Sequence, residues 1–194
     1  MSHLSPQSLT ADELQALLRV TADHPRDHLV FSLALGTGLR LGELVGMNVG
    51  DFYFPNGRPR QRVQVRAEIA KRGRTGNVFV PDALGPKLTR FWQYKIEHGE
   101  RLDPLAPLLC GVSRRRISPR RLQVLFRLWQ EIAAFDRFYP FHALRHTAVT
   151  NVYRASHDLF LAQRFARHAS PLTTTIYTHP SDEELKERLR LLPC

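Results

Sequence analysis

The chain has 194 residues, of which 43% are hydrophobic and 24% are charged, so its composition is globular and excludes wholesale disorder. Lysine and arginine number 28 against 18 aspartates and glutamates, which gives a net charge of +10. This balance favours a polyanionic partner, usually nucleic acid, although a basic protein without such a partner has the same composition. The two cysteines, Cys110 and Cys194, exclude a disulfide scaffold and a four-cysteine zinc site.

The sequence predicts one domain without a membrane-spanning segment. No apolar run approaches the ~20 residues that span a bilayer. The first residues lack the basic and apolar regions of a signal peptide. We expect a single domain over residues 1–194, with its core at about 9–180 and a last helix at about 182–191.

Helical signals dominate the first 50 residues. Thr10 and Glu13 form a capping box, and the leucines that follow recur on one helical face. The apolar run at 29–35 predicts a buried helix that ends at a glycine-rich turn. A short helix is expected to follow over about 41–47.

The pattern changes between Phe52 and Pro81. Polar and hydrophobic residues alternate over 62–69, which is the period of a strand with one face in solvent. A loop is predicted at 72–76 and a return strand at 78–80. This segment therefore predicts a small antiparallel sheet with a basic tip.

The remainder is predicted to be mostly helical. The expected helices cover about 83–98, 118–134, 143–154, 158–167 and 182–191, with a connection at 102–111. The predicted fold class is therefore mainly α (α+β), a helical bundle with a small antiparallel sheet.

Three short segments could carry chemistry, and the first is TGLRLGEL at 37–44. Arg40 lies where the glycine-containing turn enters a helix, and the free N–H groups of a helix start attract anions. Taken alone, Arg40 is more typical of a surface arginine, or of one that pairs with Glu43 three residues later.

The second segment is YPFHALRH at 139–146. His142 and Arg145 are three residues apart and therefore share a helical face. Histidine titrates near neutral pH, and arginine is a permanent phosphate-binding fork. The same pair also fits two solvated side chains, whereas the intervening Ala143 and Leu144 are expected to point into the core.

The third segment joins RHASP at 167–171 to TTTIYTH at 173–179. A single tyrosine or histidine there carries little information, because a half-buried tyrosine with a bonded hydroxyl is common. We expect no metal, since His142 and His146 lack the intervening glutamate of an HExxH pattern. We also expect no nucleotide cofactor, because the sequence has no P-loop and no GxGxxG.

Together the three segments resemble the tyrosine recombinase, or phage integrase, family over nearly the whole chain. The matches are TGLRxxEL at 37–44, HxLRH at 142–146, and His168 nine residues before Tyr177. The resemblance implies the family's mainly helical catalytic domain with a small three-stranded sheet. It also implies six catalytic positions, which are Arg40, Lys71, His142, Arg145, His168 and Tyr177.

The resemblance implies a role for each position. Tyr177 is the nucleophile, Arg40 and Arg145 clamp the scissile phosphate, and His142 and His168 complete the pocket. A tyrosine hydroxyl with a pKa of ~10 needs such help, because the phosphodiester is anionic and repels attack.

The family also has a lysine in a sheet turn. Lys71 takes this role, since no other lysine precedes Lys87, and it would protonate the departing 5′ oxygen. The resemblance implies that attack by the tyrosine forms a 3′-phosphotyrosine, which keeps the energy of the broken phosphodiester bond. Neither ATP nor metal is therefore expected to be required.

The expected partner is double-stranded DNA. Possible contacts with its backbone are Arg72, Arg74, Arg114, Arg115, Arg116, Arg120 and Arg121, although a solvated basic face has the same sequence. The amphipathic helix at 182–191 either docks into a neighbouring protomer, as in this family, or caps its own core. The first arrangement would give a homo-oligomer on DNA.

Two departures from the family pattern stand out. Ala166 and Arg167 replace the usual Leu-Gly before His168, and the N-terminal DNA-clamping domain is expected to be absent. The leading expectation is a site-specific recombinase or integrase of the cytoplasm, associated with the nucleoid. Its rivals are a type IB topoisomerase, which the TGLR and HxLRH spellings disfavour, and a DNA-binding regulator with a vestigial catalytic set.

Overall fold

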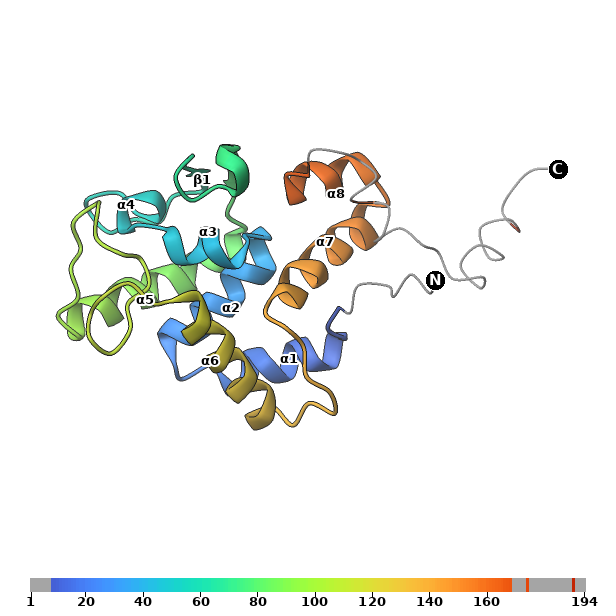
Figure 1. Cartoon of the computed structure of the whole chain (residues 1–194), viewed down its shortest axis with the longest axis horizontal. Coiled ribbons are helices and arrows are strands. Elements are labelled where there is room, and N and C mark those ends of the chain that lie inside the picture. The colour runs from blue at the N-terminus through green and yellow to red at the C-terminus, as the bar shows by residue number, and fades with distance from the viewer. Residues whose placement is uncertain (1–7, 169–173, 175–189, 191–194) are drawn as a thin grey trace.

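The computed structural model describes residues 8–168, 174 and 190, and it consists mostly of helices beside a small sheet (Figure 1). The elements are α1 (Ala11–Val20), α2 (Pro25–Thr37), α3 (Leu41–Gly46), α4 (Val49–Phe52), β1 (Arg62–Val65), η1 (Lys71–Gly73), β2 (Gly76–Phe79), η2 (Asp82–Leu84), α5 (Gly85–Glu97), α6 (Pro119–Ile132), α7 (His142–Ser156) and α8 (Leu159–Ala166). The predicted mainly helical fold is confirmed. The helix predicted at 182–191 lies outside the described residues, apart from Arg190.

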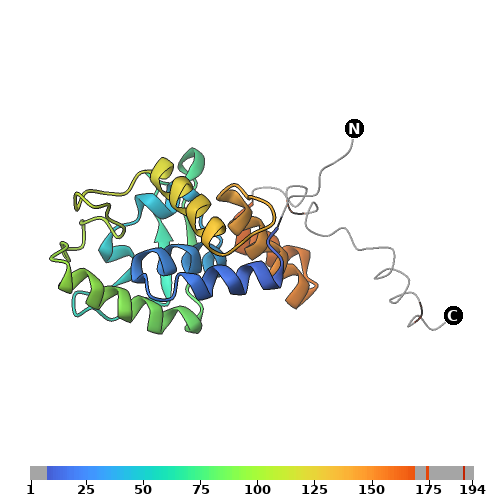
Figure 2. The same ribbon diagram turned by 90° about the horizontal axis from the view of Figure 1, so that it is seen from below.

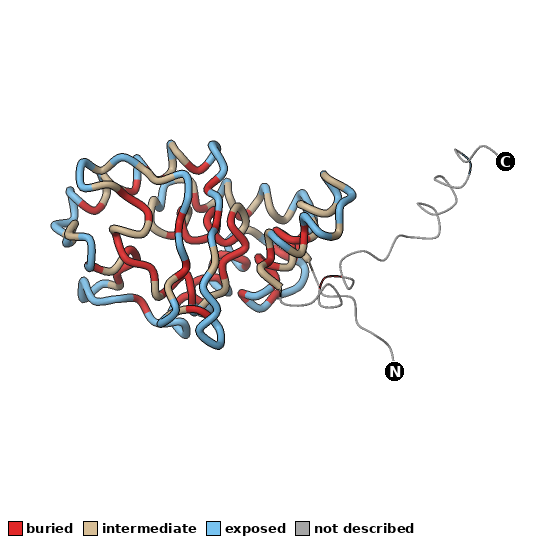
Figure 3. The backbone as a smooth tube through the Cα atoms, turned by 90° about the horizontal axis from the view of Figure 1, so that it is seen from above, coloured by how far each residue is buried: buried red, intermediate tan, exposed pale blue. Residues whose placement is uncertain are grey.

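Helix α2 forms the centre of the molecule. It packs against α5 on one side and α7 on the other, which explains why the run at 29–35 is apolar all round. Figure 3 shows buried residues running through the interior of the molecule and exposed residues along its outer turns. In the described part of the chain, no helix combines the length and the hydrophobicity needed to span a membrane.

Helices α1 and α6 pack against each other and against α2. The capping box that begins α1 is present, because Thr10 and Glu13 exchange side-chain and backbone hydrogen bonds. The indole N–H of Trp129 on α6 donates to the buried Asp27 on α2 at 2.9 Å. Figure 2 shows α7 and α8 (orange) forming one end of the molecule, away from α5 (green).

The sheet has two strands among the described residues, where three were predicted. β1 pairs antiparallel with β2, and Val65 lies opposite Gly76. The predicted strand stops early because the backbone turns at Arg66, whose carbonyl accepts from the N–H groups of Ile69 and Ala70. Lys71 consequently lies in the short helix η1, outside the ladder, whose last pair is Val65 and Gly76.

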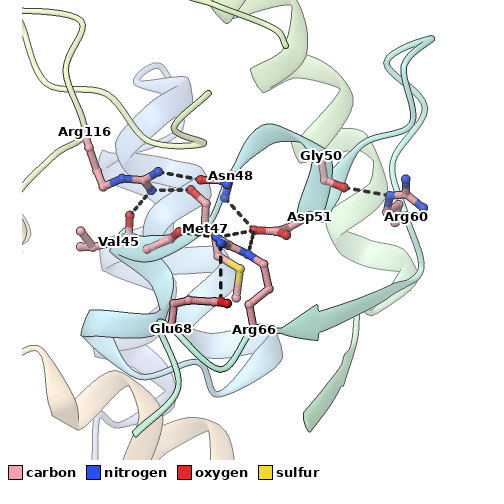
Figure 4. A network of polar contacts seen from close by, with 10 residues as sticks. Val45, Met47, Asn48, Gly50, Asp51, Arg60, Arg66, Glu68 and Arg116 are labelled. Carbon is pink, nitrogen blue, oxygen red and sulfur yellow. Dashed lines mark hydrogen bonds and ion pairs between the residues drawn. The ribbon is translucent and has the colours of Figure 1, made fainter. Parts of the chain in front are cut away.

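An arginine network fixes the corner between α3 and α4 (Figure 4). Arg116 donates to the carbonyl oxygens of Val45 and Met47, each at 2.7 Å. Arg66 donates to the carboxylate of Asp51 at 3.2 Å and to the carbonyl of Gly46 at 2.9 Å. The guanidinium of Arg116, which the sequence offered as a possible contact with DNA, is therefore already engaged in holding the corner together.

Candidate active site

Arg40 caps helix α3 and is held by its own helix. Gly38 ends α2 in the left-handed region at φ 60°, and the chain then turns into α3. The carboxylate of Glu43 accepts from the backbone N–H of Arg40 at 2.8 Å and from its Nη1 at 3.0 Å. The pairing of Arg40 with Glu43 that the spacing permits is thus present.

Arg145 joins the ends of two other helices. Its side chain is only 2% exposed, and its guanidinium donates to the carbonyl oxygens of Gly38 and Ala166. These carbonyls follow α2 and end α8 respectively. The two bonds use part of the hydrogen-bonding capacity of this buried cation. They also hold the turn between α2 and α3 against the end of α8.

His168 lies directly after α8. Its backbone N–H donates to the carbonyl of Gln163 at 3.1 Å. Its ring Nδ1 lies 2.9 Å from the hydroxyl oxygen of Thr174, which is fully buried. This contact through Nδ1 fixes the orientation of the His168 ring and leaves its other nitrogen, Nε2, on the opposite side from Thr174.

These segments enclose a basic cavity of about 420 Å³. Its lining residues are Arg40, Lys71, Arg72, Arg74, Thr75, Arg167 and His168. The lining residues come from the start of α3, the β1–β2 connection and the end of α8. These segments lie in the upper part of Figure 1. Three of the six predicted catalytic side chains thus meet in one cavity, although they come from distant parts of the sequence.

The other predicted residues divide into two groups. His142 and Arg145 lie on α7 and do not line the cavity, although Arg145 bonds to the carbonyl of Ala166 beside it. Burial, and then the charges of Arg145, Arg40 and Lys71, lower the pKa of the His142 ring. Tyr177 lies outside the described residues. The arginines at 114, 115, 116, 120 and 121 are exposed but do not line the cavity.

The histidines beside the cavity are held neutral. Burial, and then Arg145 and Arg40, lower the pKa of His168 to about 4. Burial, and then His142 and Arg145, lower the pKa of His146 to about 4, and the rings of His142 and His146 lie 4.5 Å apart. The positive charge of the site therefore comes from arginine and lysine. No group of three or more His, Cys, Asp or Glu side chains within the described residues could hold a metal ion.

Arg167 has a contact that the sequence did not reveal. Its backbone is left-handed, at φ 53° and ψ 43°, where it ends α8. Its Nη2 donates to Glu43 Oε2 at 2.5 Å, and the two side chains are 13% and 3% exposed. The sequence marked Arg167 only as a departure from a family pattern, because nothing local connects residue 43 with residue 167.

Comparison with known proteins gives consistent matches. The model of the phage integrase family matches residues 7–184. The tyrosine recombinase XerC of Proteus mirabilis is 30% identical over 179 residues, covering 90% of this chain and 55% of the relative. The chain thus spans about half the length of this curated relative.

Solved structures agree in fold. The crystal structure of the XerA recombinase matches with a TM-score of 0.80 and 25% identity, over 100% of this chain and 68% of that one. A post-cleavage complex of the XerH site-specific recombinase with palindromic difH substrate matches with a TM-score of 0.76 and 24% identity, over 96% and 53%.

Proposed function

Because this chain belongs to the phage integrase family, we propose that it is the catalytic part of a site-specific DNA recombinase. Its substrate would be double-stranded DNA, which it would cleave and rejoin through a 3′-phosphotyrosine on Tyr177. The observation that carries the proposal is the basic cavity where Arg40, Lys71 and His168 meet beside the buried Arg145.

The substrate class follows from the cavity's charge and from its relatives. Four arginines and a lysine line the cavity, and Glu43 is the carboxylate bound to two of these arginines. Such a site suits a phosphate oxygen, because guanidinium forks match its geometry. The XerH structure contains a recombinase bound to its DNA substrate, which supports DNA as the anion for this chain as well.

The reaction needs positive charge that is in place before the phosphate arrives. Arg145 is held by two carbonyl groups, so little further ordering is required when it stabilises the phosphate oxygens. Arg40 would supply the second guanidinium. Attack by the Tyr177 oxygen would form a phosphotyrosine ester and break the bond from phosphorus to the 5′ oxygen.

Proton movement would use the titratable groups of the site. Lys71 lines the cavity from η1 and would protonate the departing 5′ oxygen. His142, whose pKa burial and Arg145 lower, is neutral at pH 7 and would accept the tyrosine proton. A 5′ hydroxyl then attacks the ester, reseals the strand and restores Tyr177, so no ATP or metal is needed.

Strand exchange between two duplexes requires more than one active site. We propose that protomers contact one another through the amphipathic segment 182–191, where Leu185 and Leu189 recur at helical spacing and Leu192 follows directly on the same stripe. This segment would dock onto a neighbouring copy bound to DNA.

A covalent-adduct assay tests the proposal. Nicked duplexes of randomised sequence trap a cleaved intermediate, because the short strand beyond the nick diffuses away. We expect a protein–DNA adduct on a denaturing gel, formed equally well in excess EDTA. Tyr177→Phe keeps the ring and should abolish the adduct while DNA affinity remains.

Each other outcome has a distinct meaning. An adduct that persists in Tyr177→Phe would place the nucleophile elsewhere, with Tyr153 on α7 as the next residue to test. An adduct that requires magnesium would contradict the role of the arginines. DNA binding without any adduct in the unsubstituted protein would favour a regulator instead of a recombinase.

A further inference from the structure

One buried carboxylate serves two arginines beside the cavity. Glu43 Oε1 accepts from Nη1 of Arg40 at 3.0 Å. Glu43 Oε2 accepts from the backbone N–H of Arg40 at 2.8 Å and from Nη2 of Arg167 at 2.5 Å. The two guanidiniums therefore use different oxygens of the same carboxylate, and only Oε1 depends on the Arg40 side chain.

The fold holds Arg167 in this place despite an unfavourable backbone. A φ of 53° is a conformation that glycine adopts readily and arginine does not. The side-chain stem passes close to β2, because a Cβ built at Gly76 would lie 3.0 Å from Arg167 Cδ. The Nε of Arg167 is buried and makes no hydrogen bond among the described residues. The ion pair with Glu43 offsets the unfavourable backbone conformation and the unbonded Nε of Arg167.

The charges around Glu43 decide how firmly Arg40 is held. With Arg40 as its single cation, a carboxylate that is 3% exposed would bind that guanidinium strongly and compete with any phosphate. Arg167 supplies a second cation, so the cluster keeps a net positive charge. When the Arg40 side chain leaves Oε1, Oε2 keeps both of its donors.

We propose that Arg167 is a positioning residue for Arg40. By neutralising Glu43, it lets the Arg40 guanidinium exchange this carboxylate for a phosphate oxygen in the cavity. The inference rests on the proposed function where it concerns cleavage, but it makes a separate statement about anion binding at Arg40.

A double-mutant cycle tests the proposal. Arg167→Gln keeps the approximate length and removes the charge, and Glu43→Gln removes the carboxylate that competes for Arg40. We expect Arg167→Gln to slow adduct formation about tenfold, less than the 10²–10³-fold that loss of a direct oxyanion donor costs. In the Glu43→Gln background, the same change should alter the rate less than about twofold. Arg167→Lys should stay within about threefold of the unsubstituted protein.

The matched control is Arg164→Gln, which removes a charge from the exposed face of the same helix and should leave the rate unchanged. Equal losses from Arg167→Gln in both backgrounds would overturn the proposal, because Arg167 would then act on the phosphate directly or only on the fold. Melting temperatures of all variants report the fold. Where Arg167→Gln does not fold, the Arg167→Lys rate decides, and a tenfold loss there overturns the proposal.

A second readout does not need catalysis. Inorganic phosphate is titrated into ¹⁵N-labelled protein while the Arg40 Nε–Hε signal is followed. We expect Arg167→Gln to weaken this binding about tenfold, and Glu43→Gln to cancel that loss. If phosphate binding changes as expected in these variants but the protein forms no adduct with DNA, the proposed recombinase activity is refuted and the role of Arg167 stands. An adduct whose rate Arg167→Gln does not change would refute the role of Arg167 alone.

Discussion

The histidines of the site couple its protonation to folding. His146 and His168 have pKa values lowered to about 4 by burial first and by neighbouring positive groups second. The unfolded chain therefore binds protons below pH ~6.5 that the folded chain binds only near pH 4. The stability that these groups contribute is complete above pH ~6.5 and is lost as the pH falls from there toward 4.

Urea unfolding at pH 7.5 and pH 5 measures this effect. We expect a loss on the order of 1 kcal/mol per histidine at pH 5, after allowing for partial exposure to solvent. His146→Gln should reduce the loss. Glu43 does not interfere, because burial raises its pKa less than Arg167 and Arg40 lower it, so it stays ionised in this range. Equal stability at both pH values would contradict the neutral histidines.

Single residues also show what the sequence could and could not predict. The positions of Arg40 and Arg145 were predictable, because short motifs place each at a helix start or face. The spacing also offered the pair between Arg40 and Glu43, which the structure contains. The long-range bonds of Arg145 and Arg167 were not predictable. Arg145 binds a carbonyl 107 residues away, and Arg167 binds a carboxylate 124 residues away. Such partners become visible only once the helices are packed.

At the scale of elements, a buried ion pair secures the connection after α5. Lys95 is fully buried, and its ammonium donates to Glu100 at 2.6 Å and to the carbonyl of Leu108 at 3.1 Å. Lys95→Met would leave the Glu100 carboxylate buried without its cation. We expect a loss of about 3–5 kcal/mol in the free energy of unfolding, which is typical of a broken buried pair.

Thermal and urea unfolding would measure this change. Lys87→Met on the same helix is the matched control, because within the described part of the chain Lys87 hydrogen-bonds only to the hydroxyl of Ser32, at 2.8 Å, and should lose far less. Replacing both partners, in Lys95→Met with Glu100→Leu, should recover part of the loss. Similar stabilities for Lys95→Met and Lys87→Met would show that the pair does not hold the connection.

The elements themselves were predictable where one pattern dominated. The apolar run of α2 and the capping box of α1 gave those helices nearly in place. The strand β1 was predicted too long, because alternation continues to Ile69 in the sequence. Tertiary contacts end it, since the Arg66 side chain turns toward Asp51 and the chain folds into η1. The alternation of polar and hydrophobic residues alone cannot show where a contact with a neighbouring helix ends the strand pairing.

At the scale of the whole molecule, the charge of +10 is spread over more than one surface. Arg72 and Arg74 line the cavity, whereas the basic residues at 114–121 lie outside its lining. Each phosphate that a basic side chain neutralises releases counterions from DNA. The slope of log affinity against log salt therefore counts contacts, at about −0.9 for each phosphate neutralised.

This slope can separate the two basic surfaces. Affinity for a duplex of random sequence is measured at several salt concentrations for the unsubstituted protein and for single alanine variants. If the cavity faces the DNA, Arg72→Ala and Arg74→Ala should each reduce the slope by about one unit. The control Arg19→Ala removes an exposed charge from α1 and should leave the slope unchanged. If Arg120→Ala reduces the slope while Arg72→Ala does not, the DNA lies across α6, and the cavity cannot hold its scissile phosphate.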